Sequence, residues 1–133
     1  MAFKQIAEIA GSAMSAQTVR MNTIASNLAN AGTSGTEQNA YQARKPVFAS
    51  VFNGVGARVQ VVDVIGSQDP LERKYEPGNP LADDQGMVFY SNVNPVEEMA
   101  DMMAASRAYS TNVEVLVRIN GMQQQVLKMG EGA

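Results

Sequence analysis

The chain has 133 residues, a net charge of −3 and 45% hydrophobic residues, which suits one domain with a modest core. It contains no cysteine and no histidine, so disulfides, zinc–sulfur sites and histidine-based acid–base catalysis are excluded. The sequence has no basic patch of the kind that binds nucleic acid. No apolar run approaches the roughly 20 residues that span a bilayer.

The N-terminal segment, residues 1–31, carries the spacing of a long helix. Apolar and small residues recur at steps of three and four, as in a heptad seam. Gly11 is the one weak point inside this segment, and Gly32 is well suited to cap its C-terminal end. The seam that predicts this helix consists of Phe3, Ile6, Ala10, Ala13, Gln17, Met21, Ile24, Leu28 and Ala31.

This first predicted helix has very few charges. From Lys4 to Ala31 the only charged residues are Lys4, Glu8 and Arg20. A helix with one face in water usually carries a charged outer face, whereas this one carries Ala, Ser, Thr, Gln and Asn. One interpretation is an alanine-rich surface helix of low charge. We favour a helix that is packed on more than one side, within an assembly.

Three asparagines lie near the end of the same segment, at positions 22, 27 and 30. Asparagine is a poor residue for a helix interior because its amide competes for backbone hydrogen bonds. Amides in a packed interface, however, fix its register. We therefore hypothesise that Asn27 or Asn30 bonds to a neighbouring subunit.

Residues 32–93 have a different pattern, in which glycine and proline separate short apolar runs. The runs at 46–52, 57–65 and 87–90 are typical of strands, and "EPGNP" at 76–80 is typical of a turn. The segment is too short for more than a small antiparallel hairpin or ribbon. We predict a small β-rich middle.

A second helix is predicted over residues 94–133. Asn94 is a good N-cap, Pro95 fits the first helical position and Glu97 occupies the capping-box position. Gly121 and the glutamines that follow it weaken the pattern, so we expect irregular last turns. The apolar seam runs through Met99, Met103, Val113, Leu116, Val117 and Leu127.

The predicted fold is mainly α with a small β-rich middle, in which the two terminal helices pair as a coiled-coil core, antiparallel or parallel. Methionine is concentrated in these helices, and it fills irregular gaps between variable neighbours. Ordinary core filling explains any single methionine. Met99, Met102 and Met103 form a cluster wider than one narrow seam, so we expect at least one of them to meet another chain.

No catalytic, cofactor or metal site is predicted. Asp83 and Asp84 faintly resemble the start of a calcium loop, but Met87 and Phe89 stand where further oxygen ligands are needed, so a solvated turn is favoured. The serines have no fingerprint of a partner base. The adjacent pair Glu97–Glu98 is better explained by its place in the first helical turn.

Two long stretches resemble the terminal signatures of the bacterial flagellar axial proteins, which build rod, hook and filament-junction structures. "SAMSAQTVRMNTIASNLANAGT" (12–33) is similar to their N-terminal signature, and "NVNPVEEMADMMAASRAYSTNVEVL" (92–116) to their C-terminal one. "YQARKPVF" (41–48) and "YEPGNPLAD" (75–83) resemble the middle of a short rod member. Together these stretches cover more than half of the chain.

The resemblance implies a structural subunit of the proximal rod, the part of the drive shaft that crosses the periplasm. It implies terminal helices in the coiled-coil core of a helical tube, and a middle segment that contacts neighbouring subunits. The implied partners are copies of the chain, other rod proteins and the flagellar type III export apparatus, with no direct membrane insertion. Export without a cleaved signal fits the start of the chain, where Glu8 interrupts the apolar region that a signal peptide needs.

Matched position by position, the resemblance implies packing and subunit contacts rather than catalysis. The chain departs from the signature at Gly121, which lies in a stretch expected to stay helical. The expected subunit-interface residues are Gln17, Arg20, Asn22, Asn27, Leu28, Asn30, Met99, Met103, Arg107, Tyr109, Asn112 and Leu116.

Two other functions remain open at this point. A stand-alone coiled-coil adaptor could dock one partner through its methionine-rich helix, and a hydrolase could use a serine or the paired acids. A rod subunit should have largely disordered terminal helices in dilute solution, because each helix has few charges and little core of its own. An adaptor should be helical by itself.

Overall fold

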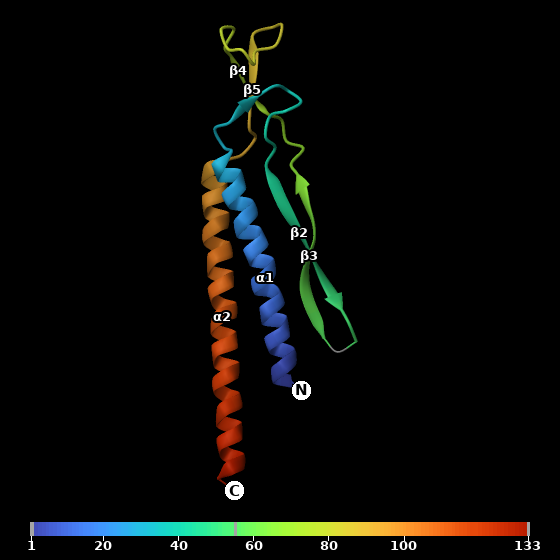
Figure 1. Ribbon diagram of the computed structural model, residues 1–133, viewed down its shortest axis with the longest axis vertical. Coiled ribbons are helices and arrows are strands. Elements are labelled where there is room, and N and C mark those ends of the chain that lie inside the picture. Colours follow the sequence, from blue (N-terminus) through green and yellow to red (C-terminus); the bar gives the residue numbers. More distant parts are fainter. Residues whose placement is uncertain (1, 55, 133) are drawn as a thin grey trace.

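The computed structural model describes residues 2–54 and 56–132, and Figure 1 shows two long helices with a β-rich middle. The predicted mainly-α fold with a small antiparallel β region is confirmed. The predicted helical ranges also include Met1 and Ala133, which lie outside the described residues. The elements are α1 (Ala2–Ala29), β1 (Ser34–Gly35), β2 (Arg44–Phe52), β3 (Ala57–Gly66), β4 (Glu72–Tyr75), β5 (Met87–Tyr90) and α2 (Pro95–Glu131).

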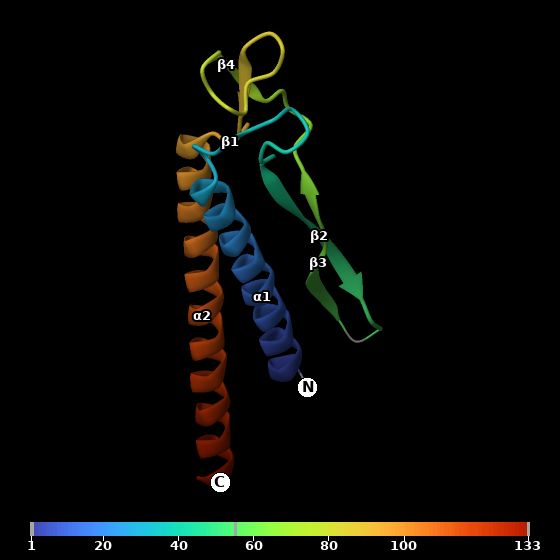
Figure 2. The same ribbon diagram turned by 45° about the horizontal axis from the view of Figure 1, so that its top comes forward.

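The two helices pair in opposite directions. In Figures 1 and 2 the C-terminal end of α1 lies beside the N-terminal end of α2, and strands β1, β4 and β5 lie beyond that shared end. Because α2 has 37 residues and α1 has 28, α2 is about 14 Å longer at ~1.5 Å per residue. The C-terminal part of α2 therefore extends past the N-terminus of α1.

One face of α2 packs against α1 with heptad spacing. Its buried and half-buried residues include a series with alternating steps of four and three, as in an antiparallel coiled coil. These residues, which we call the inner seam, are Glu98, Met102, Ala105, Tyr109, Asn112, Leu116 and Ile119.

The sequence predicted the period of this seam but placed it on the wrong face of α2 for pairing with α1. Of the predicted positions, Met99, Met103, Val117 and Leu127 are 58, 66, 66 and 63% exposed, and only Leu116 belongs to the inner seam. The inner seam includes an acid and an amide, whereas the neighbouring face is apolar. Hydrophobicity therefore favoured the exposed face.

Helix α1 lies between α2 and the β2–β3 hairpin. Apart from Ile24, its buried residues are small or polar, as suits the close approach of two neighbours: Ala10, Ala16, Thr23 and Asn27. Helix α1 is packed on two sides as expected, but both sides are covered by the same chain, and its packing within an assembly stays a prediction. The low charge of α1 is thus explained within one subunit.

The hairpin is long and strongly twisted. Strands β2 and β3 pair antiparallel from Arg44 opposite Gly66 to Phe52 opposite Ala57, with a register shift after Val47. Such a bulge increases the local right-handed twist. The two strands of the ribbon cross along its length (Figure 1), and both β2 and β3 contact α1.

A second, three-stranded sheet with the order β1–β5–β4 closes the end of the helix pair. Its centre is β5, where Val88 is fully buried and Phe89 is 7% exposed. The sequence predicted β5 but not β1 and β4, which are too short or too charged to show a hydrophobic period. The predicted turn at 76–80 is present, but the positive φ of 78° between β4 and β5 belongs to Gly86 rather than Gly78.

Helix α2 differs from the prediction in two details. Asn94 caps α2 as expected, accepting hydrogen bonds from Val96 N (3.2 Å) and Glu97 N (3.4 Å), but Glu97 pairs with Lys45 instead of completing a capping box. Helix α2 continues regularly through Gly121 to Glu131, so the expectation of irregular last turns was wrong.

The end of α1 also differs from the prediction. It ends at Ala29, and the predicted cap Gly32 does not have a positive φ. Side chains satisfy the end of this helix instead, since Asn30 Nδ2 donates to Ser26 O (2.8 Å) and Thr33 Oγ1 to Asn30 O (2.8 Å).

Candidate functional site

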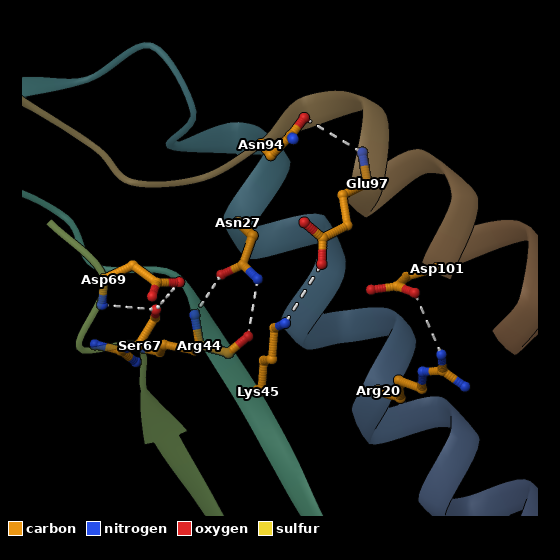
Figure 3. Close-up of polar contacts among 9 residues, drawn as sticks. All are labelled: Arg20, Asn27, Arg44, Lys45, Ser67, Asp69, Asn94, Glu97 and Asp101. Atoms are coloured by element: carbon orange, nitrogen blue, oxygen red, sulfur yellow. Dashed lines mark hydrogen bonds and ion pairs between the residues drawn. The ribbon is translucent and has the colours of Figure 1, made fainter. Parts of the chain in front are cut away.

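The most completely bonded side chain of α1 is Asn27, which is fully buried. Its Nδ2 donates to Arg44 O (2.8 Å), and its Oδ1 accepts from Arg44 N (3.0 Å) and from the Tyr41 hydroxyl (2.8 Å). Figure 3 shows both bonds to Arg44, at the start of β2. The carboxamide thus occupies the place that the peptide group of a neighbouring strand would take.

This geometry corrects the hypothesis that Asn27 bonds to a neighbouring subunit, because its bonds are made within the chain and its side chain has no exposed surface. Asn30 likewise donates within the chain, to the end of α1. Asn22 is exposed and makes no hydrogen bond with its side chain to any described residue. Of the three amides, Asn22 is exposed, Asn30 is half-buried and Asn27 is buried.

Arg20 ties the two helices together. Its Nη2 lies 3.7 Å from Asp101 Oδ1, and Lys45 Nζ lies 3.5 Å from Glu97 Oε1, so β2 is also tied to α2 (Figure 3). The side chains of the second pair are more than half exposed, and such surface pairs contribute about 0–1 kcal/mol. These contacts orient the elements more than they stabilise them.

A second hydrogen bond joins α1 to the hairpin. Val59 N donates to Ser12 Oγ (3.1 Å), while Ser12 Oγ itself donates to Ile9 O. Cavities of ≈ 200 and ≈ 390 Å³ lie on either side of this contact, between α1 and β3. The hairpin is therefore held mainly by Asn27 near one end and Ser12 near the other.

The predicted interface residues divide into two groups. The first is buried, half-buried or tied within the subunit and consists of Gln17, Arg20, Asn27, Leu28, Asn30, Tyr109, Asn112 and Leu116. Gln17 Oε1 is buried without a partner among the described residues. The second group is exposed and consists of Asn22, Met99, Met103 and Arg107.

An exposed apolar stripe follows α2 beside the inner seam. Met99, Met103, Val113 and Val117, which we call the outer seam, are 58, 66, 37 and 66% exposed and also follow heptad positions. A cavity of ≈ 490 Å³ lies at Met102, Met103, Ser106, Arg107 and Ser110. Helix α2 thus carries two faces with heptad spacing, and among the described residues only the inner one is covered.

The end of α2 is a second uncovered surface. No residue of α2 after Ile119 is buried, and four large apolar side chains are exposed there: Met122, Val126, Leu127 and Met129. Several exposed apolar side chains within three helical turns are typical of a site of association. The sequence did not predict that the end of α2 is uncovered, because only the pairing of α1 with α2 shows which residues of α2 lie beyond α1.

A cluster of hydrogen-bonded polar groups lies in the β4–β5 region. Asn79 Nδ2 and the Tyr90 hydroxyl each donate to the Glu76 carboxylate at 2.9 Å, and these bonds lower the pKa of Glu76. The bond to Glu76 raises the pKa of Tyr90. Among residues 2–54 and 56–132, no group of three or more acids gathers as metal ligands, and neither helix is long and apolar enough to cross a membrane.

Both ends of the chain match models of flagellar rod families. Residues 8–35 match "Flagella basal body rod protein", and residues 84–129 match "Flagellar basal body rod FlgEFG protein C-terminal". These two ranges contain most of α1 and α2.

Full-length relatives agree with the family models. The chain is 47% identical to the flagellar basal-body rod protein FlgC of Escherichia coli O6:H1, over 98% of this chain and all of the relative. It is 45% identical to FlgC of Salmonella typhimurium over the same shares, and 33% identical to FlgC of Borreliella burgdorferi over 93% of this chain and 95% of the relative. The chain therefore belongs to the FlgC family of flagellar basal-body rod proteins.

Proposed function

We propose that the chain is a structural subunit of the bacterial flagellar proximal rod, which assembles helically with copies of itself and with other rod proteins. The observation that carries this proposal is the two-sided character of α2. Its inner seam is covered by α1, while its outer seam and its last three turns present apolar side chains to water. Full burial of a large apolar side chain contributes about 1.5–3 kcal/mol, so several such residues favour association strongly.

Within this proposal, the exposed group of predicted residues makes the contacts between subunits. Met99 and Met103 supply adaptable apolar surface. Arg107 on the same helix and Asn22 on α1 supply directional polar groups. The helix pair is held together by Gln17, Tyr109, Asn112 and Leu116. These residues affect the contact between subunits by fixing how the two helices pack.

We further propose that the chain reaches the periplasm through the flagellar type III export apparatus, without cleavage of a signal peptide. The support is the rod-protein family to which the chain belongs. Mass spectrometry of the subunit from purified basal bodies should recover its N-terminal residues. Loss of the first 15–30 residues, the length of a cleaved signal, would contradict this route.

A structural role leaves no catalytic step to assign, and we expect no turnover and no cofactor. The comparisons give no support to a stand-alone adaptor, because the relatives that span the whole chain carry the rod-protein name.

The experiment that tests the proposal is deletion of the gene followed by purification of basal bodies. We expect the deletion strain to lack complete rods and to be non-motile, with both restored by the wild-type gene. A tagged chain should co-purify with the basal body. Intact rods in the deletion strain would overturn the proposal.

A further inference from the structure

The chain contains two Asn–Gly dipeptides in opposite settings, Asn53–Gly54 at the tip of the β2–β3 hairpin and Asn120–Gly121 inside α2. In such a dipeptide the glycine nitrogen can attack the asparagine side chain, because glycine puts no Cβ in the way. We propose that Asn53 is a site of spontaneous deamidation, whereas the helix protects Asn120. This inference stands independently of the rod function.

The reaction needs only water. The Gly54 nitrogen loses its proton to solvent and forms a bond with Cγ of Asn53. The Cγ–Nδ2 bond breaks and ammonia leaves, which gives a five-membered succinimide. Water then adds to either ring carbonyl and opens the ring to aspartate or isoaspartate. Nothing is oxidised or reduced, and one added carboxylate takes the net charge from −3 to −4.

The hairpin tip offers the space that this ring closure requires. Asn53 is exposed, and the preceding Phe52 is 73% exposed. Gly54 has a φ of 81°, and no atom of a described residue, its chain neighbours aside, lies within 4 Å of the position that a Cβ would take. The backbone N–H of Gly54 makes no hydrogen bond to any described residue. Nothing therefore has to be broken to free the attacking nitrogen, and loop tips open at little cost in free energy.

The existing hydrogen bonds at the tip support the attack as well. Gly56 N donates to Asn53 Oδ1 (3.2 Å), and Asn53 N donates to Gly56 O (3.2 Å). The first bond places a donor on the oxygen that becomes negative as the Gly54 nitrogen adds to Cγ. A donor aimed at developing charge stabilises the transition state, as in an oxyanion hole.

Asn120 has the same dipeptide chemistry but a different backbone. It lies within α2, where each N–H donates a hydrogen bond to the carbonyl four residues earlier. The N–H of Gly121 therefore donates to the carbonyl of Val117. Attack on Asn120 Cγ requires this bond to open and the backbone to leave helical geometry. The chain thus provides its own matched control.

The test follows both asparagines in the folded full-length chain, incubated in mildly alkaline buffer and digested with trypsin. The peptide 45–58 contains Asn53 as its only amide side chain, so its conversion from amide to acid is unambiguous in a mass spectrum. Peptide 119–128 reports Asn120. We expect Asn53 to convert at least about tenfold faster than Asn120, which corresponds to ~1.4 kcal/mol in the activation free energy.

Two controls assign the difference to the fold. In denaturing urea the two rates should converge, because the helix no longer holds Gly121. Asn53→Gln should suppress conversion in peptide 45–58, because the longer side chain would have to close a six-membered ring. If folded Asn53 converts no faster than folded Asn120, or does not convert at all, the proposal is overturned.

Discussion

The Asn27 side chain bonds both backbone groups of Arg44, its Nδ2 to the carbonyl at 2.8 Å and its Oδ1 to the N–H at 3.0 Å. One residue of α1 thereby fastens the helix to the start of the hairpin. The contact joins positions 17 apart in the chain and explains why an asparagine occupies a buried helical position. An amide that is unfavourable for a helix becomes favourable once it satisfies the edge of a strand.

Replacing this amide should destabilise the fold itself. Asn27→Leu has a similar volume but leaves the N–H and C=O of Arg44 without their partner, and each unsatisfied group costs about 1–3 kcal/mol. Because Arg44 is partly reached by water, we expect a loss of ~2 kcal/mol in the free energy of unfolding, measured by urea denaturation. The control Asn22→Leu, on the exposed face of the same helix, should change stability by less than about 0.5 kcal/mol. Equal effects of the two variants would contradict the role given to Asn27.

Gly86 should not tolerate a side chain. Its φ is 78°, and an added Cβ would lie 2.8 Å from Cε2 of Tyr75. We expect Gly86→Ala to lower the free energy of unfolding by about 1–3 kcal/mol, the cost of a non-glycine residue in this conformation. Gly78→Ala is the matched control, since it lies in the same loop with open space and no positive φ. A Gly86 variant as stable as the Gly78 variant would show that the loop relaxes without cost.

The Glu76 cluster predicts a measurable titration. Hydrogen bonds from Asn79 and then Tyr90 lower the pKa of Glu76 below its ordinary value of 4.5. Because the folded pKa is the lower one, this contribution to stability is present above the ordinary value and is lost as the pH falls through the folded pKa. In an NMR titration, Asn79→Ala should raise the pKa of Glu76 towards the ordinary value, and Tyr90→Phe should raise it less. An unchanged pKa in both variants would contradict the assignment.

The overhang of α2 should be the least protected part of the helix pair. Residues 120–131 have no cover from α1, and Gly121 costs the helix about 1 kcal/mol relative to alanine. In the isolated subunit we expect amide hydrogens of residues 120–131 to exchange well before those of residues 98–119, as measured by hydrogen–deuterium exchange. Equal protection along α2 would show that the overhang is stable without a neighbour.

Much of the fold could be predicted from local signals. The N-cap at Asn94 and the helical periods depend on residues close in sequence, and the structure reproduces them. Strands β1 and β4 could not be predicted, because their stability comes from pairing with β5 rather than from their own pattern. The role of Asn27 likewise depends on Arg44, which no local pattern links to it.

The position of the covered face on α2 shows why the interface was predicted only in part. Glu98 and Asn112 are polar but lie in the covered face, whereas Met99 and Met103 are apolar but exposed. Hydrophobicity identified residues that are buried only if another chain is present. The family signature named residues of both faces together, since it does not separate packing within a subunit from contacts between subunits.

The central claim is that the outer seam of α2 meets a neighbouring subunit. Met103→Glu puts a charge into this seam, whereas Ala104→Glu puts the same charge on an exposed position of the next residue, away from both seams. Neither change touches the inner seam, so both purified chains should keep the wild-type free energy of unfolding within about 0.5 kcal/mol.

The decisive measurement is incorporation of each variant into purified basal bodies, in a strain that lacks the wild-type gene. We predict that Met103→Glu is exported but missing from the rod, and that its cells do not swim, while Ala104→Glu assembles and supports swimming. Normal rods and swimming with Met103→Glu would contradict the account.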